Sequence, residues 1–274
     1  MTTSQKVLIG AAAAAVIVGG VAIGLTVSLT PDKLDLSTIH TEAAEETMAS
    51  SSETPETTPP ETMESTEQTD ASSSVTANLE TYTSGKVTIQ YPVVSNLEDQ
   101  ELQEKINELL KNNALSVIDA NEIDTENDQL DIQCSVISVN RSRLTATYEG
   151  TLNVQGAAHP TNLFYSNTVS MTQAADLGFS DFTDAYTMAG YVLSDDVQFL
   201  NLTSEELSAV LEYRSSLSLE TLTEIFEGAD FPLNQAGEWP QSFSYEKQGM
   251  ICFSMPVPHA LGDYVIVSYD PVTK

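Results

Sequence analysis

The sequence predicts an α+β domain, in which an antiparallel sheet packs with helices, preceded by a single transmembrane helix and a disordered linker. Three features lead to this prediction: an uncharged apolar run near the N-terminus, a Ser-, Thr-, Glu- and Pro-rich stretch behind it, and a remainder in which runs of strands and runs of helices follow one another. We therefore expect four segments: residues 1–6 (cytoplasmic tail), 7–29 (anchor), 30–84 (linker) and 85–274 (extracellular domain).

The anchor is expected at Val7 to Leu29, a run without a charged residue. As a helix it would span about 34 Å, enough for a hydrocarbon core of roughly 30 Å. A cleaved signal peptide is the alternative, but its apolar region is usually only about 7 to 15 residues long. Lys6 and the α-amino group precede the run, and the other flank soon becomes acidic. This charge bias predicts a single-pass protein of the cell membrane with its C-terminal domain outside.

The linker is expected because Pro31 to Ser84 contains 12 acidic residues, one Lys and almost no side chains able to form a core. Such a composition cannot offset the entropy lost on folding. A flexible coil of about 50 residues has an end-to-end distance on the order of 40 Å. We therefore expect a tether that holds the domain away from the membrane.

The charge of the chain limits its partners. The net charge is −30, and Gly85 to Lys274 alone carries 28 acidic against 8 basic residues. A field of this sign repels nucleic acids and anionic lipid headgroups and attracts cations. We expect no nucleic-acid binding, and the acidity serves either solubility or the selection of a partner.

The first elements of the domain are a strand and a helix. Apolar and polar residues alternate at residues 86–91, which predicts a strand. Ser95 and Glu98 have the spacing of a capping box and predict a helix to about residue 118. The acidic segment 119–131 lacks the glycine that a calcium-binding helix-loop-helix needs at its sixth position, so we expect a solvated loop there.

Strands and then helices follow. Short spacing between strands is typical of an antiparallel meander, which we expect at residues 130–136, 144–154 and 163–171. Thr203 and Glu206 form a second capping box, and Gly228 is expected to end the helix after that one. Three strands close the chain, at residues 243–245, 250–255 and 264–269.

Residues that commonly carry catalysis or bind metals are few. Cys134 and Cys252 lie in apolar, strand-like runs, and one disulfide or two buried free thiols fit them equally well. His40, His159 and His259 do not have the spacing of a helical zinc motif, and no Gly-x-Ser-x-Gly or Gly-rich phosphate loop is present. We expect no enzyme, catalytic residue, metal or cofactor. A glycan hydrolase with paired carboxylates is the alternative, without named residues.

Two segments combine glycine, proline and histidine, and we expect each to form a rigid turn. In the first, Gly156 permits a positive φ, and Pro160 fixes the exit direction beside His159. The second segment has the same features: Pro258, His259 and Gly262. Each histidine either satisfies backbone groups in its turn or belongs to a recognition surface. These six residues are the candidate ligand-binding residues.

At these residues the chain resembles the envelope domain shared by RsiV-type lysozyme-sensing anti-sigma factors and the N-terminal region of PdaC-type peptidoglycan deacetylases. The matching motifs lie in two family-like halves, about 85–150 and 151–274. They are Ile89-Gln-Tyr-Pro-Val-Val94, Gln103-Glu-Lys-Ile-Asn107, Gly156-Ala-Ala-His-Pro160, Leu177-Gly-Phe-Ser-Asp-Phe182, Gly249-Met-Ile-Cys-Phe253 and Pro258-His-Ala-Leu-Gly262.

The chain also departs from the family pattern. His259 stands where the family usually has Tyr, Ala157 replaces one Gly, and the connection before Pro258 is shorter. Only six residues precede the apolar run and no deacetylase domain follows, so sequestration of a sigma factor is not expected. The resemblance implies a tethered extracellular binding or sensor domain of a bacterial cell envelope. Its expected partner is lysozyme, another cationic protein or peptidoglycan, and a purely structural surface protein is the remaining alternative.

Overall fold

The computed structural model describes residues 74–272, so the predicted anchor at Val7 to Leu29 and most of the predicted linker lie outside the described residues. The described helices and strands belong to one compact unit, Glu67–Lys274. They form a mixed α+β fold with two sheets and five α-helices. In this part of the chain no helix is both long enough and apolar enough to cross a membrane.

The larger sheet, sheet A, has six strands in chain order. They are β1 (Thr76–Ser84), β2 (Val87–Ser95), β3 (Gln129–Val139), β4 (Arg143–Asn153), β5 (Thr161–Ser170) and β6 (Ala175–Leu177). Neighbours are antiparallel except β2 and β3, which are parallel because helix α1 (Gln100–Ala120) connects them. A parallel pair needs such a crossover, whereas tight turns suffice elsewhere. The prediction of an antiparallel sheet is therefore wrong for the pair β2 and β3.

The domain begins earlier than predicted. The predicted linker extends to Ser84, but its last nine residues form β1. β1 pairs with β2 along its whole length, from Thr76 opposite Ser95 to Ser84 opposite Val87. Its side chains are mostly polar and exposed, like those of the linker, so hydropathy does not distinguish them. Backbone pairing with β2 orders this segment, and the linker boundary moves to about Thr76.

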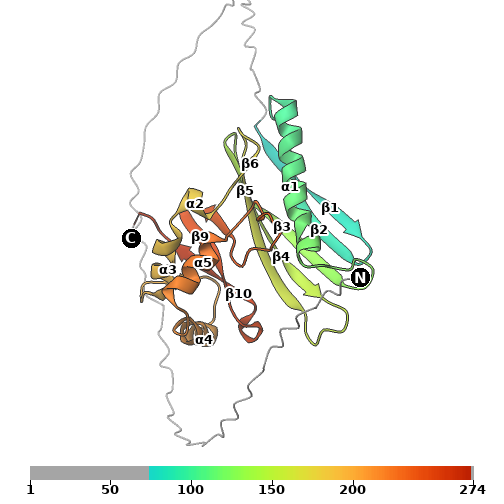
Figure 1. Ribbon diagram of the computed structural model, residues 1–274. Helices are drawn as coiled ribbons and strands as arrows, with labels where there is room; N and C mark the ends of the chain where they lie inside the picture. The colour runs from blue at the N-terminus through green and yellow to red at the C-terminus, as the bar shows by residue number, and fades with distance from the viewer. Residues whose placement is uncertain (1–73, 273–274) are drawn as a thin grey trace, which may run out of the picture. The chain divides into compact units, whose positions relative to one another are not determined.

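Helix α1 covers one face of sheet A (Figure 1). It starts later than the predicted capping box, because the Asp99 carboxylate accepts the N–H of Leu102 at 3.0 Å, whereas Ser95 still pairs with β1. Asp and Ser are comparable N-caps, so the pairing of β2 decides between them. The side chains that α1 buries against the sheet recur at helical spacing: Ile106, Leu110, Asn113, Ala114 and Val117.

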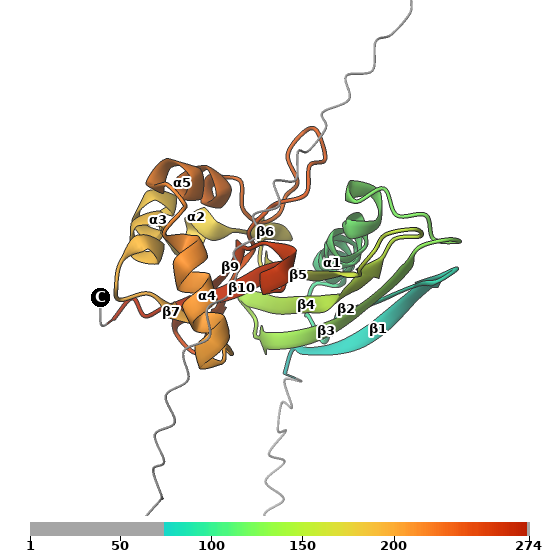
Figure 2. The same ribbon diagram turned by 90° about the horizontal axis from the view of Figure 1, so that it is seen from below.

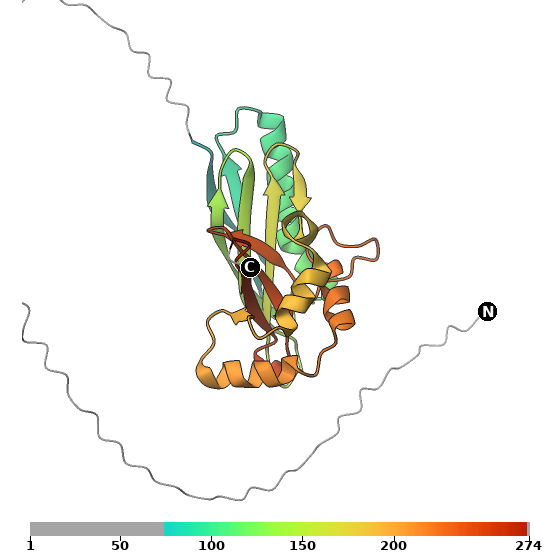
Figure 3. The ribbon, with the colours of Figure 1, turned by 90° about the vertical axis from the view of Figure 1, so that its left-hand side faces the viewer.

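The smaller sheet, sheet B, has the antiparallel order β7-β10-β9-β8. Its strands are β7 (Gln198–Phe199), β8 (Ser244–Lys247), β9 (Met250–Pro256) and β10 (Tyr264–Tyr269). Four helices lie beyond sheet B as seen from sheet A (Figures 2 and 3): α2 (Phe179–Phe182), α3 (Ala185–Leu193), α4 (Ser204–Arg214) and α5 (Leu219–Glu227). The predicted capping box of Thr203 and Glu206 is confirmed at α4, and Gly228 caps the end of α5 as predicted.

Sheet B packs against the face of sheet A that is opposite to α1. The Ser166 hydroxyl of β5 donates to the carbonyl oxygen of Ser244 in β8 at 2.6 Å, and Arg143 of β4 pairs with Glu246 of β8 at 3.1 Å. One hydrophobic cluster lies mainly between α1 and sheet A, and a second lies between sheet B and α2–α5. The contact with sheet B involves β4 and β5, so alternate residues of β3 on the same face stay exposed.

Two further expectations are settled by the fold. The predicted boundary between halves, at residues 150 and 151, falls inside β4, which pairs with both β3 and β5. Cys134 of β3 and Cys252 of β9 are buried free thiols, so the disulfide alternative is not realised. Burial raises the pKa of Cys134 to about 12 and also raises the pKa of Cys252. Both thiols are therefore protonated and unreactive at neutral pH.

Candidate functional site

The two predicted turns lie side by side, although their histidines are one hundred residues apart in the sequence. Gly156, His159 and Pro160 belong to the β4–β5 turn, and the other three candidates lie in the β9–β10 connection around the 3-10 helix η1 (His259–Leu261). The ring centroids of His159 and His259 are 5.7 Å apart, with 25° between the ring planes. The structure therefore places both histidines at one site.

Both predicted glycines have a positive φ, +87° at Gly156 and +99° at Gly262. A Cβ atom at either position would meet no other atom within 4 Å. The backbone conformation, and not a close approach, therefore favours glycine here. In the second turn, Pro258 precedes η1 and Gly262 ends it in the left-handed region.

Asp263 joins the two turns. Its carboxylate pairs with Nδ1 of His259 at 2.9 Å and accepts the backbone N–H of Asn162 at 2.7 Å. At the other end of the β4–β5 turn, Asp128 accepts the backbone N–H of Gln155 at 2.7 Å. His259 therefore has a structural partner. Among the described residues, His159 has a ring contact with His259 and no hydrogen bond.

The acidic segment 119–131 supports the first turn. Asp124 accepts hydrogen bonds from the side chain of Asn127 at 2.8 Å and from the N–H of Glu126 at 3.0 Å, and these bonds lower its pKa. Asp128 is buried, so the loop is not wholly solvated as predicted. Within residues 74–272 no group of three or more His, Cys, Asp or Glu is arranged to hold a metal ion. The carboxylates instead satisfy turn backbone.

A groove of about 600 Å³ runs from η1 over the open face of sheet A. Its polar side is formed by β3, β4 and β5, with Gln133, Glu149, Thr151 and Asn162, and its apolar side by β10 and the β7–α4 connection. A second hollow of about 470 Å³ lies between α4 and η1 and shares Glu206, Leu261 and Gly262 with the first. We call these two adjoining hollows the η1 groove.

The lining of the η1 groove is acidic. It includes Glu149, Glu205 and Glu206 but no Lys or Arg. Glu206 accepts the N–H of Thr203 at 2.8 Å, and this bond lowers its pKa, so its carboxylate is ionised at neutral pH. Burial, and then the charge of Glu149, raise the pKa of Tyr264 to about 12. Such a groove attracts cations and repels phosphates.

The η1 groove contains little that could perform nucleophilic catalysis. Asp263 orients His259 as the acid of a catalytic dyad would. However, the lining includes no Ser or Cys that could act as a nucleophile beside that imidazole.

Sequence reasoning misses the acidic and aromatic residues of the site, which include Glu149, Glu206, Asp263 and Tyr264. Glu149 is a single exposed charge in a strand rich in Thr, which is the only local signal of a role on that face. Glu206 is recognisable as a capping residue, and nothing in the sequence indicates that α4 packs beside η1. Their grouping depends on long-range packing.

Comparison with known proteins gives no match to a model of a protein family and no match among curated proteins. Two solved structures are similar. A DUF3298 family member from Bacteroides fragilis is 12% identical with a TM-score of 0.38, covering 72% of this chain and 88% of that one. A DUF3298 family protein from Pseudomonas aeruginosa is 9% identical with a TM-score of 0.37, covering 72% and 90%. DUF3298 is the domain found in RsiV-type and PdaC-type proteins. At these scores the similarity assigns no ligand and no residue role.

Proposed function

We propose that the folded unit is the ligand-binding domain of a membrane-anchored, outward-facing protein of a bacterial cell envelope, and that its ligand is a cationic protein. The observation that carries this proposal is the η1 groove, which has three carboxylates, no Lys or Arg, and two rigid turns at its rim. Lysozyme is the cationic protein that the sequence resemblance suggests.

The charge of the whole domain supports the same ligand class. An excess of acidic residues raises the local concentration of a cationic partner and accelerates its association. The groove concentrates this field because carboxylates face an apolar wall that includes Leu200, Leu261 and Ile266. A basic protein surface with long Lys or Arg side chains would match both walls, since such side chains have an apolar stem and a charged head.

Peptidoglycan is a second candidate ligand, favoured by a different feature of the groove. Gln133, Thr151 and Asn162 supply amide and hydroxyl groups to the lining of the groove on the open face of sheet A, which also includes Tyr264. Polar groups of this kind next to an aromatic ring suit the hydroxyls and apolar faces of sugars.

The decisive experiment is a calorimetric titration of the unit 67–274 with lysozyme at low and at high salt. We expect binding that weakens with salt, because screening reduces attraction between exposed charges. The double variant Glu149→Gln/Glu206→Gln should weaken binding by at least about tenfold. The matched control is Glu104→Gln/Glu108→Gln, which removes two exposed charges from α1 on the opposite face of sheet A.

Each alternative has its own readout. Absence of heat at low salt would exclude lysozyme, and equal weakening in both double variants would exclude the groove. Co-sedimentation with purified peptidoglycan tests the second ligand, and release of reducing ends from it would support the hydrolase instead. Protease treatment of intact cells tests the orientation, since an outward-facing domain is digested without lysis.

A further inference from the structure

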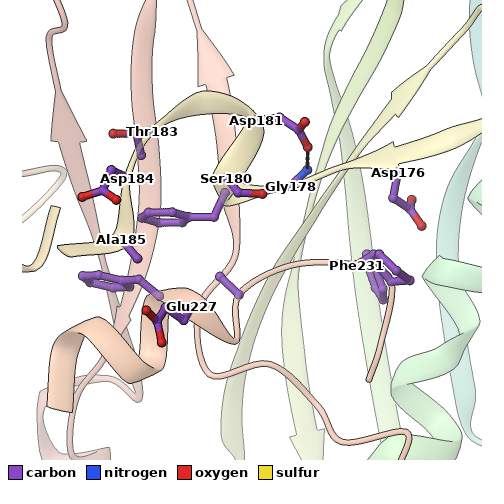
Figure 4. Close-up of a pocket in the computed structure, with 13 residues that line it drawn as sticks. Asp176, Gly178, Ser180, Asp181, Thr183, Asp184, Ala185, Glu227 and Phe231 are labelled. Atoms are coloured by element: carbon purple, nitrogen blue, oxygen red, sulfur yellow. Dashed lines mark hydrogen bonds between the residues drawn. The ribbon is translucent and has the colours of Figure 1, made fainter. Parts of the chain in front are cut away.

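A pocket of about 680 Å³, separate from the η1 groove, lies among α2, the start of α3, the end of α5 and the connection that follows α5 (Figure 4). It shares no lining residue with the η1 groove. We call it the α2–α5 pocket. Sequence reasoning assigns none of its residues to a ligand, although part of its lining, Gly178 to Asp181, belongs to the Leu177–Phe182 segment of the family resemblance.

The α2–α5 pocket has an aromatic base. Phe179 stacks on Phe226 with ring centroids 5.2 Å apart and 8° between the planes, and Phe231 belongs to the lining as well. All three rings are almost completely buried, but they form two apolar surfaces: Phe179 and Phe226 belong to the cluster beside sheet B, and Phe231 belongs to the cluster under α1. Such a surface accepts the hydrocarbon part of a ligand.

Carboxylates surround this base. Figure 4 shows Asp176 beside Phe231 at one end of the pocket, with Asp184 and Glu227 toward the other end and Asp181 between them. No Lys, Arg or His lines the pocket. A ligand that reaches the base therefore meets negative charge on several sides, which favours a cation and excludes an anion.

Two of the carboxylates are fixed by local hydrogen bonds. Asp181 accepts the N–H of Gly178 at 2.8 Å, drawn as a dashed line in Figure 4. Asp184 caps α3 by accepting the N–H and the hydroxyl of Thr187, both at 2.7 Å. These bonds hold the two carboxylates in place before any ligand arrives, which reduces the entropy that binding must overcome.

Asp176 differs from the others because it is half-buried. Its Oδ1 accepts hydrogen bonds from the amides of Asn113 at 2.7 Å and Asn167 at 2.9 Å. Both partners are neutral, and burial raises the pKa of Asp176 in spite of them. Nearby, Asp230 is almost fully buried and accepts hydrogen bonds from Ser244 without a cationic partner. A cation in the pocket would stabilise the ionised form of the Asp176 carboxylate.

We propose that the α2–α5 pocket binds the guanidinium group of an arginine side chain, with its methylene stem against Phe231 and its head against Asp176. Guanidinium is preferred to ammonium because it is less strongly hydrated, lies flat on aromatic surfaces and can donate to Oδ2 of Asp176 while Oδ1 keeps its two amide hydrogen bonds. This inference deepens the proposed function and depends on it for the source of the arginine, a cationic protein ligand.

The affinity for guanidinium should depend on pH. Asp176 faces Asn113 of α1, Asn167 of β5 and the acidic Asp230 of the connection after α5, so no neighbour supplies positive charge. A bound cation stabilises the ionised carboxylate, and binding then releases protons where Asp176 is partly protonated. Affinity therefore rises with pH through the acidic range and levels off once the carboxylates are ionised.

The test uses N-butylguanidinium as the probe and N-butylurea as its uncharged control, titrated into the unit 67–274 and followed by NMR. We expect saturable binding of the cation and none of the urea. Asp176→Asn should lower the affinity for N-butylguanidinium by at least about tenfold. Glu227→Gln should lower this affinity less, because Glu227 is exposed. The matched control, Glu220→Gln, lies on α5 outside the pocket and should change nothing.

A second variant guards against misfolding of Asp176→Asn. Ser180→Trp fills the pocket from an exposed position of α2 and should abolish cation binding with an unchanged melting temperature. Equal binding of butylguanidinium by all variants, or equal binding of butylurea, would overturn the proposal.

Failure of this inference can be distinguished from failure of the proposed function. One outcome is that Glu149→Gln/Glu206→Gln lowers the affinity for lysozyme while Asp176→Asn and Ser180→Trp leave it unchanged. In that case the α2–α5 pocket binds no arginine of lysozyme, and the proposed function stands. If butylguanidinium binds as expected and lysozyme gives no heat, the proposed ligand is wrong, and the pocket retains its chemistry for an arginine of another source.

Discussion

Sheet A with α1 and the helical layer beside sheet B differ in how they use charge. Gly85 to Ser170 has twelve acidic and five basic residues, and pairs such as Lys105 with Glu101 at 3.0 Å form there. Met171 to Ser242 has thirteen acidic residues and one basic residue, Arg214. Arg214 donates to the backbone carbonyls of Val192 and Ser194 instead of to an acid. In the helical layer the carboxylates thus have few basic partners, and the α2–α5 pocket lies there.

The two cores differ as well. Under α1, Tyr148 stacks on Tyr165 with centroids 4.4 Å apart, and the Tyr165 hydroxyl donates to the carbonyl of Ala114. Beside sheet B the corresponding cluster is phenylalanine, with Phe226 in edge contact with Phe253 at 5.0 Å. The helical layer compensates for its charge repulsion with apolar burial, because it has few ion pairs to do so.

The largest expected effect tests whether these regions unfold together. Leu110→Ala should cost about 3 kcal/mol and Phe226→Ala about 4 kcal/mol, since each empties a fully buried site in a different cluster. Because the two sheets share a buried hydrogen bond and an ion pair, each variant should shift a single urea transition. Circular dichroism and Trp239 fluorescence would measure the unfolding transition of each variant. Two separate transitions would show that sheet A folds without the helical layer.

The next effect concerns the buried acid of the helical layer. Burial raises the pKa of Asp230 from its ordinary value to about 7, against the hydrogen bonds from Ser244 and Phe179 that lower it. The folded state therefore holds a proton that the unfolded state releases, and stability falls as pH rises toward 7. Between pH 5 and pH 8 the loss from this group should be about 3 kcal/mol.

Asp230→Asn is the variant that checks this. The asparagine cannot ionise, so the difference in unfolding free energy between pH 5 and pH 8 should shrink by that amount. Urea unfolding at both values measures it. An undiminished difference would mean that other acids, and not Asp230, make the domain sensitive to pH.

The elements that sequence reasoning predicts well are those specified locally. Thr203 with Glu206 and the terminal Gly228 fix the helices α4 and α5, and alternating residues identify β3 to β5, because caps and periodicity act within a few residues. β1 is missed since its residues Thr76–Ser84 resemble the linker, and only the partner strand orders them.

The candidate site divides in the same way. Gly156 and Gly262 are predictable as turn residues, since a positive φ leaves a mark on composition. That His159 would lie beside His259, or Asp176 beside Phe231, depends on how sheets A and B pack. No local pattern encodes such a grouping, so the α2–α5 pocket is found only in the folded chain.

A smaller effect distinguishes His259, which lines the η1 groove, from His159, whose ring lies beside it. His259→Ala should cost about 1 kcal/mol because it removes the partner of Asp263, which joins the two turns. His159→Ala should change stability by less than about 0.5 kcal/mol, as exposed substitutions without a hydrogen bond usually do. Thermal melting of both variants checks this. Loss of lysozyme affinity in His159→Ala alone would assign that histidine to recognition, whereas a large loss of stability would make it structural.

The smallest effect returns to the tyrosine pair under α1. Tyr148 is fully buried, and among the described residues its hydroxyl has only the thiol of Cys134, a weak hydrogen-bonding group, as a polar neighbour, whereas the Tyr165 hydroxyl donates to Ala114 at 2.9 Å. Tyr148→Phe should therefore raise the unfolding free energy by about 0.5 kcal/mol, while Tyr165→Phe should lower it by about 1 kcal/mol. Urea unfolding of the two variants compares them directly. A loss in both would mean that the Tyr148 hydroxyl has an effective partner, either the Cys134 thiol or an internal water, because removal of an unsatisfied group cannot destabilise the core by that route.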